Sequence, residues 1–134
     1  MSKPNFTGVW KFNPTKSVLQ IPAPDSTIFL IEHQEPVLHI SRTHIVGEKS
    51  DTFTLDLTTD GKEVILDLDD LWVQARTYWD GEILVFDTNL VRAGKEATNL
   101  VRYKLADTLD MLIAEERLQS KELSYNNIWV LDKQ

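Results

Sequence analysis

A few cationic side chains are the residues of this sequence whose types could do chemistry. The guanidinium of Arg102 is planar and permanently charged, so it could bind a carboxylate, sulfate or phosphate group through paired hydrogen bonds. The structural alternative for Arg102 is an internal ion pair with Glu115 or stacking on an aromatic ring. Arg42 and His44 are two positions apart, so in a β-strand they share one face and add positive potential there.

No catalytic motif accompanies these residues. The sequence has no cysteine, and its five glycines lie at predicted turns and in the first predicted strand, so nucleophile elbows and phosphate-binding glycine loops are absent. His44 could act as a general base oriented by Glu115 or Asp87, but only residue type supports that pairing. We therefore assign no catalytic residue.

Short runs rich in β-branched and aromatic residues predict the elements that position these side chains. Turn residues separate the runs, and the Asp60-Gly61 and Asp80-Gly81 pairs predict hairpins, because type I′ turns need positive φ at both central residues. The composition of 109–121 would also suit a helix. The predicted strands are 6–13, 27–34, 37–46, 51–58, 62–68, 71–79, 82–91, 98–105, 111–118 and 127–132.

The spacing of these strands predicts an all-β fold. No interval is long enough for a series of crossover helices, so an antiparallel up-and-down meander is expected. A chain of 134 residues suits one domain, 1–134, and ten strands in it either form two sheets or close into a barrel that has no exposed edges.

Composition excludes several classes of partner. The net charge of −7 argues against nucleic-acid binding, which depends on clustered basic side chains. No apolar stretch is long enough for a membrane span, and residues 1–5 precede no apolar signal segment, so a cytoplasmic protein is expected.

Several segments resemble the calycin superfamily, which includes the lipocalins and the intracellular fatty-acid-binding proteins. The start, NFTGVWKF (5–12), is similar to their first strand, in which Gly-x-Trp closes the barrel floor. YWDGEILV (78–85), KEATNLVR (95–102) and WVLDK (129–133) are similar to later segments of the fatty-acid-binding proteins. The resemblance implies a roughly ten-stranded barrel that binds a small molecule inside.

Two departures from those proteins change what the resemblance implies. The interval from Asn13 to Ser26 is too short for their helix-turn-helix lid, so no helical lid is expected. Arg102 falls at the first position of their carboxylate clamp, but Trp129 and Leu131 occupy the other two, so the complete clamp is not expected. The short connection looks more like that of small bacterial lipocalin-like proteins.

The same resemblance supplies a strand register and hence an expected lining. His33 and His44 point inward in this register whereas His39 does not, so the three histidines are not expected to form a metal site. The lining is mainly apolar with a few cations, which suits a small amphipathic ligand. The expected ligand-binding residues are Arg102, Arg42, His44, Phe29, Ile31, Ile40, Phe53, Leu55, Thr77, Trp79, Phe86, Ile113, Arg117 and Trp129.

These features predict a carrier or sensor that binds a small hydrophobic or amphipathic molecule, with an anionic group opposite Arg102. No cofactor and no metal are expected. Two alternatives remain: an isomerase or cyclase that uses the same cavity, and a protein-interaction module with a filled barrel. Trp72 and Tyr78 are expected to face outward and could form a homodimer contact.

Overall fold

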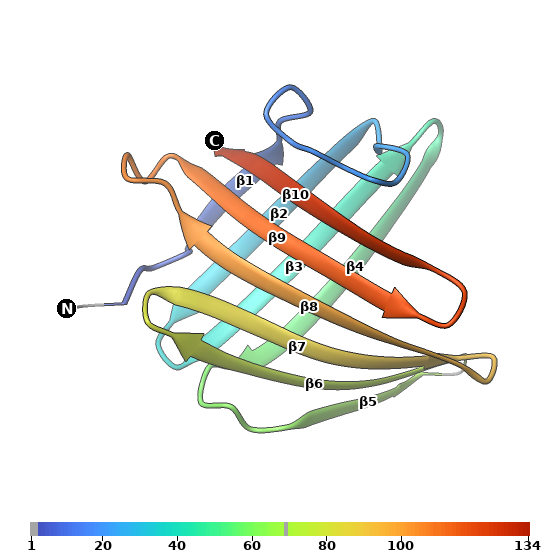
Figure 1. Cartoon of the computed structure of the whole chain (residues 1–134). Helices are drawn as coiled ribbons and strands as arrows, with labels where there is room; N and C mark the ends of the chain where they lie inside the picture. Colours follow the sequence, from blue (N-terminus) through green and yellow to red (C-terminus); the bar gives the residue numbers. More distant parts are fainter. Residues whose placement is uncertain (1–2, 69) are drawn as a thin grey trace.

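The computed structural model describes residues 3–68 and 70–134, and within them the chain forms ten strands and no helix (Figure 1). This confirms the predicted all-β fold, and the ambiguous segment 109–121 is a strand. No described residue belongs to a helix long and apolar enough to cross a membrane. The strands are β1 (Gly8–Phe12), β2 (Ser26–Gln34), β3 (Val37–Val46), β4 (Lys49–Thr58), β5 (Val64–Leu68), β6 (Leu71–Asp80), β7 (Ile83–Arg92), β8 (Lys95–Leu105), β9 (Met111–Ser120) and β10 (Ser124–Lys133).

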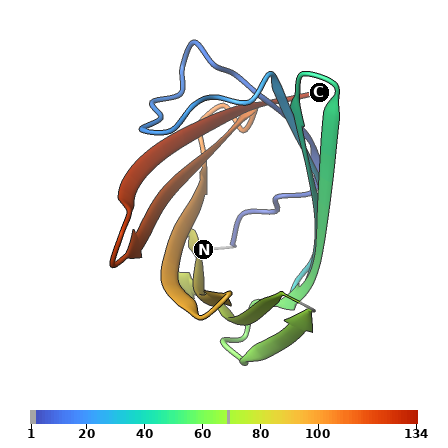
Figure 2. The ribbon, with the colours of Figure 1, turned by 90° about the vertical axis from the view of Figure 1, so that its right-hand side faces the viewer.

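All neighbouring strands are antiparallel, and the sheet curls into a barrel in the order β4-β3-β2-β1-β10-β9-β8-β7-β6-β5. Figure 2 shows β2–β4 forming one wall and β8–β10 forming the opposite wall. The hydrogen-bonded ladder is continuous except between β4 and β5, the two edge strands, so the barrel is nearly closed.

The two Asp-Gly pairs behave differently. Asp80 and Ile83 flank the β6–β7 hairpin, whose antiparallel pairing was predicted, but the turn differs from type I′ because only Gly81 has positive φ, at 64°. The hairpin predicted at Asp60-Gly61 is wrong, because β4 and β5 do not pair. Gly61 instead donates its N–H to the Thr77 carbonyl of β6, at 2.8 Å.

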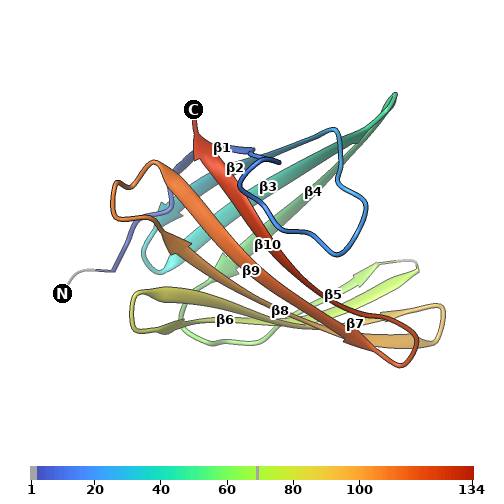
Figure 3. The same cartoon turned by 45° about the horizontal axis from the view of Figure 1, so that its top comes forward.

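The connection from residue 13 to residue 25 completes the wall where β1 ends. Because β1 has five residues and β10 has ten, part of β10 has no partner in β1. Val18 and Ile128 exchange backbone hydrogen bonds of 2.8 and 2.7 Å, and Gln20 N–H donates to Asn127 Oδ1, at 2.8 Å. The connection therefore lies along β10 (Figure 3), and the expected absence of a helical lid agrees with the structure.

One end of the barrel, which we call the floor, is closed by aromatic side chains. Phe6 is fully buried and stacks between His33 and Trp79, with ring centroids 6.0 and 6.1 Å away. Trp10 Nε1 donates to the Phe6 carbonyl, at 2.9 Å. A Cβ on Gly8 would lie 3.4 Å from Trp10 Nε1, so glycine allows this close packing.

A partly exposed hydrogen-bond network centred on Glu35 stabilises the floor. Glu35 accepts hydrogen bonds from Thr59 Oγ1, from Trp79 Nε1 and from His33 Nε2, the last at 3.0 Å. Burial by itself would raise the pKa of Glu35, but these hydrogen bonds outweigh it and lower the pKa. His33 Nδ1 accepts the Phe6 N–H, so its proton is on Nε2 and the ring has no free nitrogen for other chemistry.

Candidate ligand-binding site

The inner surface of the barrel changes character from the floor to the other end, which we call the mouth. Near the floor, inward side chains such as Ile31, Leu38 and Leu84 are fully buried and pack together. Toward the mouth, inward side chains are only half-buried, so solvent reaches the inner surface there. These half-buried residues are Arg42, His44, Phe53, Leu55, Thr88, Asn99, Val101, Glu116, Leu118 and Trp129.

Arg42 is the cation of this inner surface. From β3 it reaches across the barrel to β8, where its Nη2 donates to the Tyr103 hydroxyl, at 2.8 Å. Its guanidinium carbon lies 5.4 Å from the Phe29 ring centroid, 5.8 Å from that of Phe86 and 5.9 Å from that of Tyr103. Burial raises the pKa of Tyr103, so the hydroxyl is neutral.

The charge and one N–H group of Arg42 have no partner among the described residues. Among residues 3–68 and 70–134 no carboxylate forms an ion pair with it, and its buried Nε has no hydrogen-bond partner. A buried donor without a partner is costly, so an acceptor group of a ligand would be favoured here.

Glu116 is the half-buried anion of the same surface, whereas Asp51 on β4 shares this face but is exposed. Its Oε1 accepts from Asn127 Nδ2, at 3.0 Å, and from Trp129 Nε1, at 2.9 Å, while Oε2 accepts from Asn99 Nδ2, at 3.1 Å. All three partners are neutral, and they come from the neighbouring strands β8 and β10. The carboxylate is therefore held in one orientation, and no cation among the described residues forms an ion pair with it.

His44 is an inward polar residue on which both charges act. Its Nδ1 is 2.8 Å from Thr27 Oγ1, and its ring centroid is 6.2 Å from that of Trp129. Burial lowers the pKa of His44 and Arg42 lowers it further, while Asp51 and Glu116 act in the opposite direction. The ring is neutral near pH 7 and adds a polar group, not a charge, to the inner surface.

The predicted lining is right in orientation for most residues. Strand register and burial place eleven of them on the inner face, whereas their role in binding stays a prediction. The inward residues of the predicted set are Arg42, His44, Phe29, Ile31, Ile40, Phe53, Leu55, Thr77, Trp79, Phe86 and Trp129.

The predicted inward orientation of Arg102, Ile113 and Arg117 is wrong. Buried Tyr103 and Ala114 pair with each other and face inward, so their neighbours on β8 and β9 face outward. A register shifted by one residue moves every side chain of a strand to the other face. Arg102 instead forms an ion pair with Asp80, at 2.9 Å, on the outer surface.

The carboxylates suggested to orient His44 as a general base are also misplaced. Glu115 pairs with Lys104, at 3.4 Å, and Asp87 pairs with Arg76, at 3.5 Å, both on the outer face. The described residues contain no group of His, Asp or Glu side chains that could hold a metal ion. Trp72 and Tyr78 do face outward on β6, and a homodimer through them stays a prediction.

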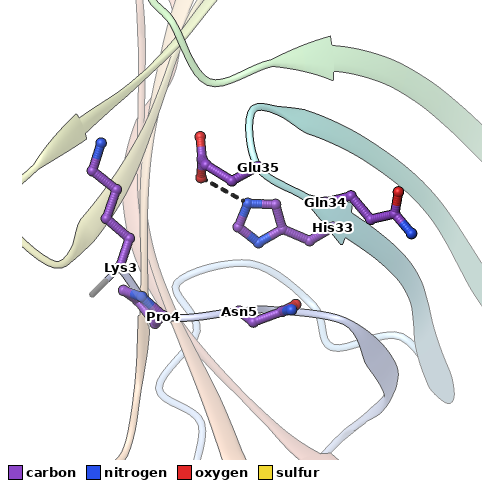
Figure 4. A pocket seen from close by; sticks show the side chains of 6 residues that line it. All are labelled: Lys3, Pro4, Asn5, His33, Gln34 and Glu35. Atoms are coloured by element: carbon purple, nitrogen blue, oxygen red, sulfur yellow. Dashed lines mark hydrogen bonds and ion pairs between the residues drawn. The ribbon is translucent and has the colours of Figure 1, made fainter.

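Two surface pockets lie at the floor, outside the inner surface. A pocket of about 440 Å³ is lined by the N-terminal segment and the β2–β3 turn, and Figure 4 shows the His33–Glu35 hydrogen bond at its side. A second pocket, of about 330 Å³, shares His33 and Gln34 with the first. His33 and Glu35 already use their polar atoms in the floor network, so these pockets offer few free groups to a ligand. The first pocket is lined by Lys3, Pro4, Asn5, His33, Gln34 and Glu35.

Known structures share this architecture over nearly their whole length. A secretory abundant heat soluble protein from Ramazzottius varieornatus is similar with a TM-score of 0.65 at 12% identity, covering 100% of this chain and 98% of that one. Zebrafish ileal bile acid-binding protein complexed with cholic acid gives 0.64 at 11%, covering 96% and 98%. The Schistosoma mansoni fatty acid binding protein in complex with arachidonic acid gives 0.55 at 10%, covering 96% of each chain.

These similarities show that the chain has the same antiparallel β-barrel fold as these proteins, which is the fold that the sequence resemblance implied. No family model matches the sequence, and no curated protein matches it either.

Proposed function

We propose that this protein binds a small hydrophobic or amphipathic molecule on the inner surface of the barrel near the mouth. The observation that carries the proposal is the combination of half-buried, inward apolar side chains with a cation, Arg42, that has no carboxylate partner in the described chain. Two structures of similar fold hold cholic acid and arachidonic acid, which supports a hydrophobic ligand. The packed floor limits the ligand to the mouth half.

In this proposal the polar contact is Arg42, and not Arg102 as the sequence predicted. It points inward, it is surrounded by Phe29, Phe86 and Tyr103, and its Nε lacks an acceptor. Apolar walls would remove the hydrocarbon of a ligand from water, at about 25 cal/mol per Å² of buried area. The guanidinium would then fix one polar end of the ligand.

Displacement of an environment-sensitive fluorescent dye by dodecanoate and dodecanol tests this proposal. We expect both compounds to displace the dye, and Arg42→Met to weaken dodecanoate by about tenfold or more while changing dodecanol little. Arg102→Met is the matched control, because it removes an outward guanidinium. The proposal is overturned if neither compound displaces the dye, or if Arg42→Met and Arg102→Met weaken dodecanoate equally.

A further inference from the structure

The inner surface carries two half-buried opposite charges that are not paired with each other in the described chain, while Asp51, opposite His44 on β4, adds an exposed carboxylate on the same face. Arg42 projects from β3 on one wall, and Glu116 projects from β9 on the wall opposite (Figure 2). No ion pair between them exists in the described part of the chain, and both charges act on the ring of His44. A ligand entering at the mouth meets both charges.

Near each of the two charges, one buried polar atom has no hydrogen-bond partner among the described residues. Asn99 donates its Nδ2 to Glu116 Oε2, which fixes the amide so that its Oδ1 faces away from that carboxylate. This Oδ1 is buried and has no donor among the described residues, while Arg42 Nε is buried without an acceptor. A hydrogen-bond donor is therefore missing at Asn99, beside Glu116, and an acceptor is missing at Arg42.

The surroundings of Glu116 suit a cationic group. The carboxylate receives three hydrogen bonds from neutral donors, and only one of these reaches Oε2, so Oε2 can accept another. The half-buried indole of Trp129 lies beside it, with its N–H directed at Oε1, and leaves Oε2 to other donors. An ammonium group would supply both the missing donors and the missing positive charge.

We propose that the ligand is a zwitterionic amphiphile, whose ammonium group binds Glu116 and Asn99 and whose anionic group binds Arg42. This rests on the proposed function and specifies its ligand class. A simple fatty carboxylate binds Arg42 but is repelled by Glu116. A simple amine binds Glu116 but is repelled by Arg42. A ligand with both groups satisfies both ends.

Competition between dodecyl compounds that differ only in their head group tests this inference. In the wild-type protein we expect N-dodecylglycine to bind about tenfold or more tightly than dodecanoate, dodecylamine or dodecanol, because each added charge-assisted hydrogen bond favours it. Dye displacement below the micelle concentration gives the affinities.

Two variants show whether Glu116 contacts the ligand or only stabilises the fold. Glu116→Gln keeps the shape of the side chain, and Asn99 can turn its amide to remain bonded. We expect this variant to weaken N-dodecylglycine and dodecylamine by about tenfold and to leave dodecanoate unchanged or tighter. Glu115→Gln, its outward neighbour paired with Lys104, should change none of these affinities.

The outcomes distinguish this inference from the proposed function. If dodecanoate binds most tightly and Glu116→Gln does not change the ratio of amine to carboxylate affinity, the zwitterion proposal is overturned while the proposed function stands. If no dodecyl compound displaces the dye, the proposed function fails and the inference fails with it. If Glu116→Gln does not fold, the ranking of head groups in the wild-type protein decides.

Discussion

The contact between Arg42 and Tyr103 gives the sharpest test of the inner surface, because it joins two opposite walls through one hydrogen bond. Arg42 Nη2 lies 2.8 Å from the Tyr103 hydroxyl, Tyr103 is 1% exposed, and Arg42 Nε has no partner among the described residues. Tyr103→Phe and Arg42→Met each remove one side of this contact and approximately conserve shape.

The expected magnitudes follow from which polar atoms each variant leaves unpaired. Tyr103→Phe leaves the buried guanidinium without its acceptor and should cost about 1.5–3 kcal/mol, the usual range for a hydrogen bond to a charged group. Arg42→Met leaves the Tyr103 hydroxyl unpaired, a cost of about 1–3 kcal/mol, but it also removes the burial of a charge. These two effects oppose each other, so the net change should be small.

The double variant should be at least as stable as the wild-type protein, because it leaves neither group unpaired. Tyr103→Phe should therefore stabilise the Arg42→Met background by about 1–3 kcal/mol, because it removes the unpaired hydroxyl there, whereas it destabilises the wild-type protein. Urea unfolding followed by tryptophan fluorescence measures the four proteins, with equal m-values required. Tyr78→Phe, on the outer face, is the control and should be additive with Arg42→Met.

Additivity of Arg42→Met and Tyr103→Phe within about 0.5 kcal/mol would refute this reasoning. It would mean that the two side chains do not interact in solution and that Arg42 is solvated at the mouth.

Two further predictions concern other parts of the chain. Leu109 has φ of 63° and an exposed side chain, so Leu109→Gly should raise the free energy of unfolding by about 0.5–1 kcal/mol, and a lower thermal midpoint would contradict this. The pKa of His44 is below its ordinary value of 6.5, so the unfolded chain takes up this proton first, and stability is lost as pH falls below 6.5 toward the folded pKa. His44→Asn should make urea midpoints less dependent on pH in that window, whereas unchanged dependence would exclude this role.

The strands were predictable because their local signals agree. β-Branched and aromatic runs bounded by turn residues mark most of them, whereas β9 also suits a helix by composition, and the meander follows from the short intervals. The hairpin predicted at Asp60-Gly61 was wrong for a physical reason. An Asp-Gly pair indicates a local turn of the backbone, but it does not determine whether the flanking strands pair. Here the chain passes from one sheet edge to the other.

The register of β8 was wrong although the sequence contains the signal. Arg102 and Lys104 alternate with Val101, Tyr103 and Leu105, and the polar-out rule places the charged pair outside. The inward orientation instead came from the carboxylate clamp of the resembling proteins.

Glu116 could not be found from the sequence by the same rule. The more apolar alternating set of β9 is the inner one, but it includes Glu116, which the polar-out rule on its own would place outside. The three donors that make an inward carboxylate tolerable come from β8 and β10, and only the folded structure brings them together.

The unpaired seam between β4 and β5 has a consequence for how the chain could be rearranged. A circular permutant that starts at β5 and ends at β4, with a linker joining the natural termini, would visit every strand of the sheet in spatial order. The loop that is cut, residues 59–63, spans the one place where no ladder hydrogen bonds cross. New termini at this seam would therefore leave each strand pairing intact, and the permutant would form the same barrel from strands connected in a different order.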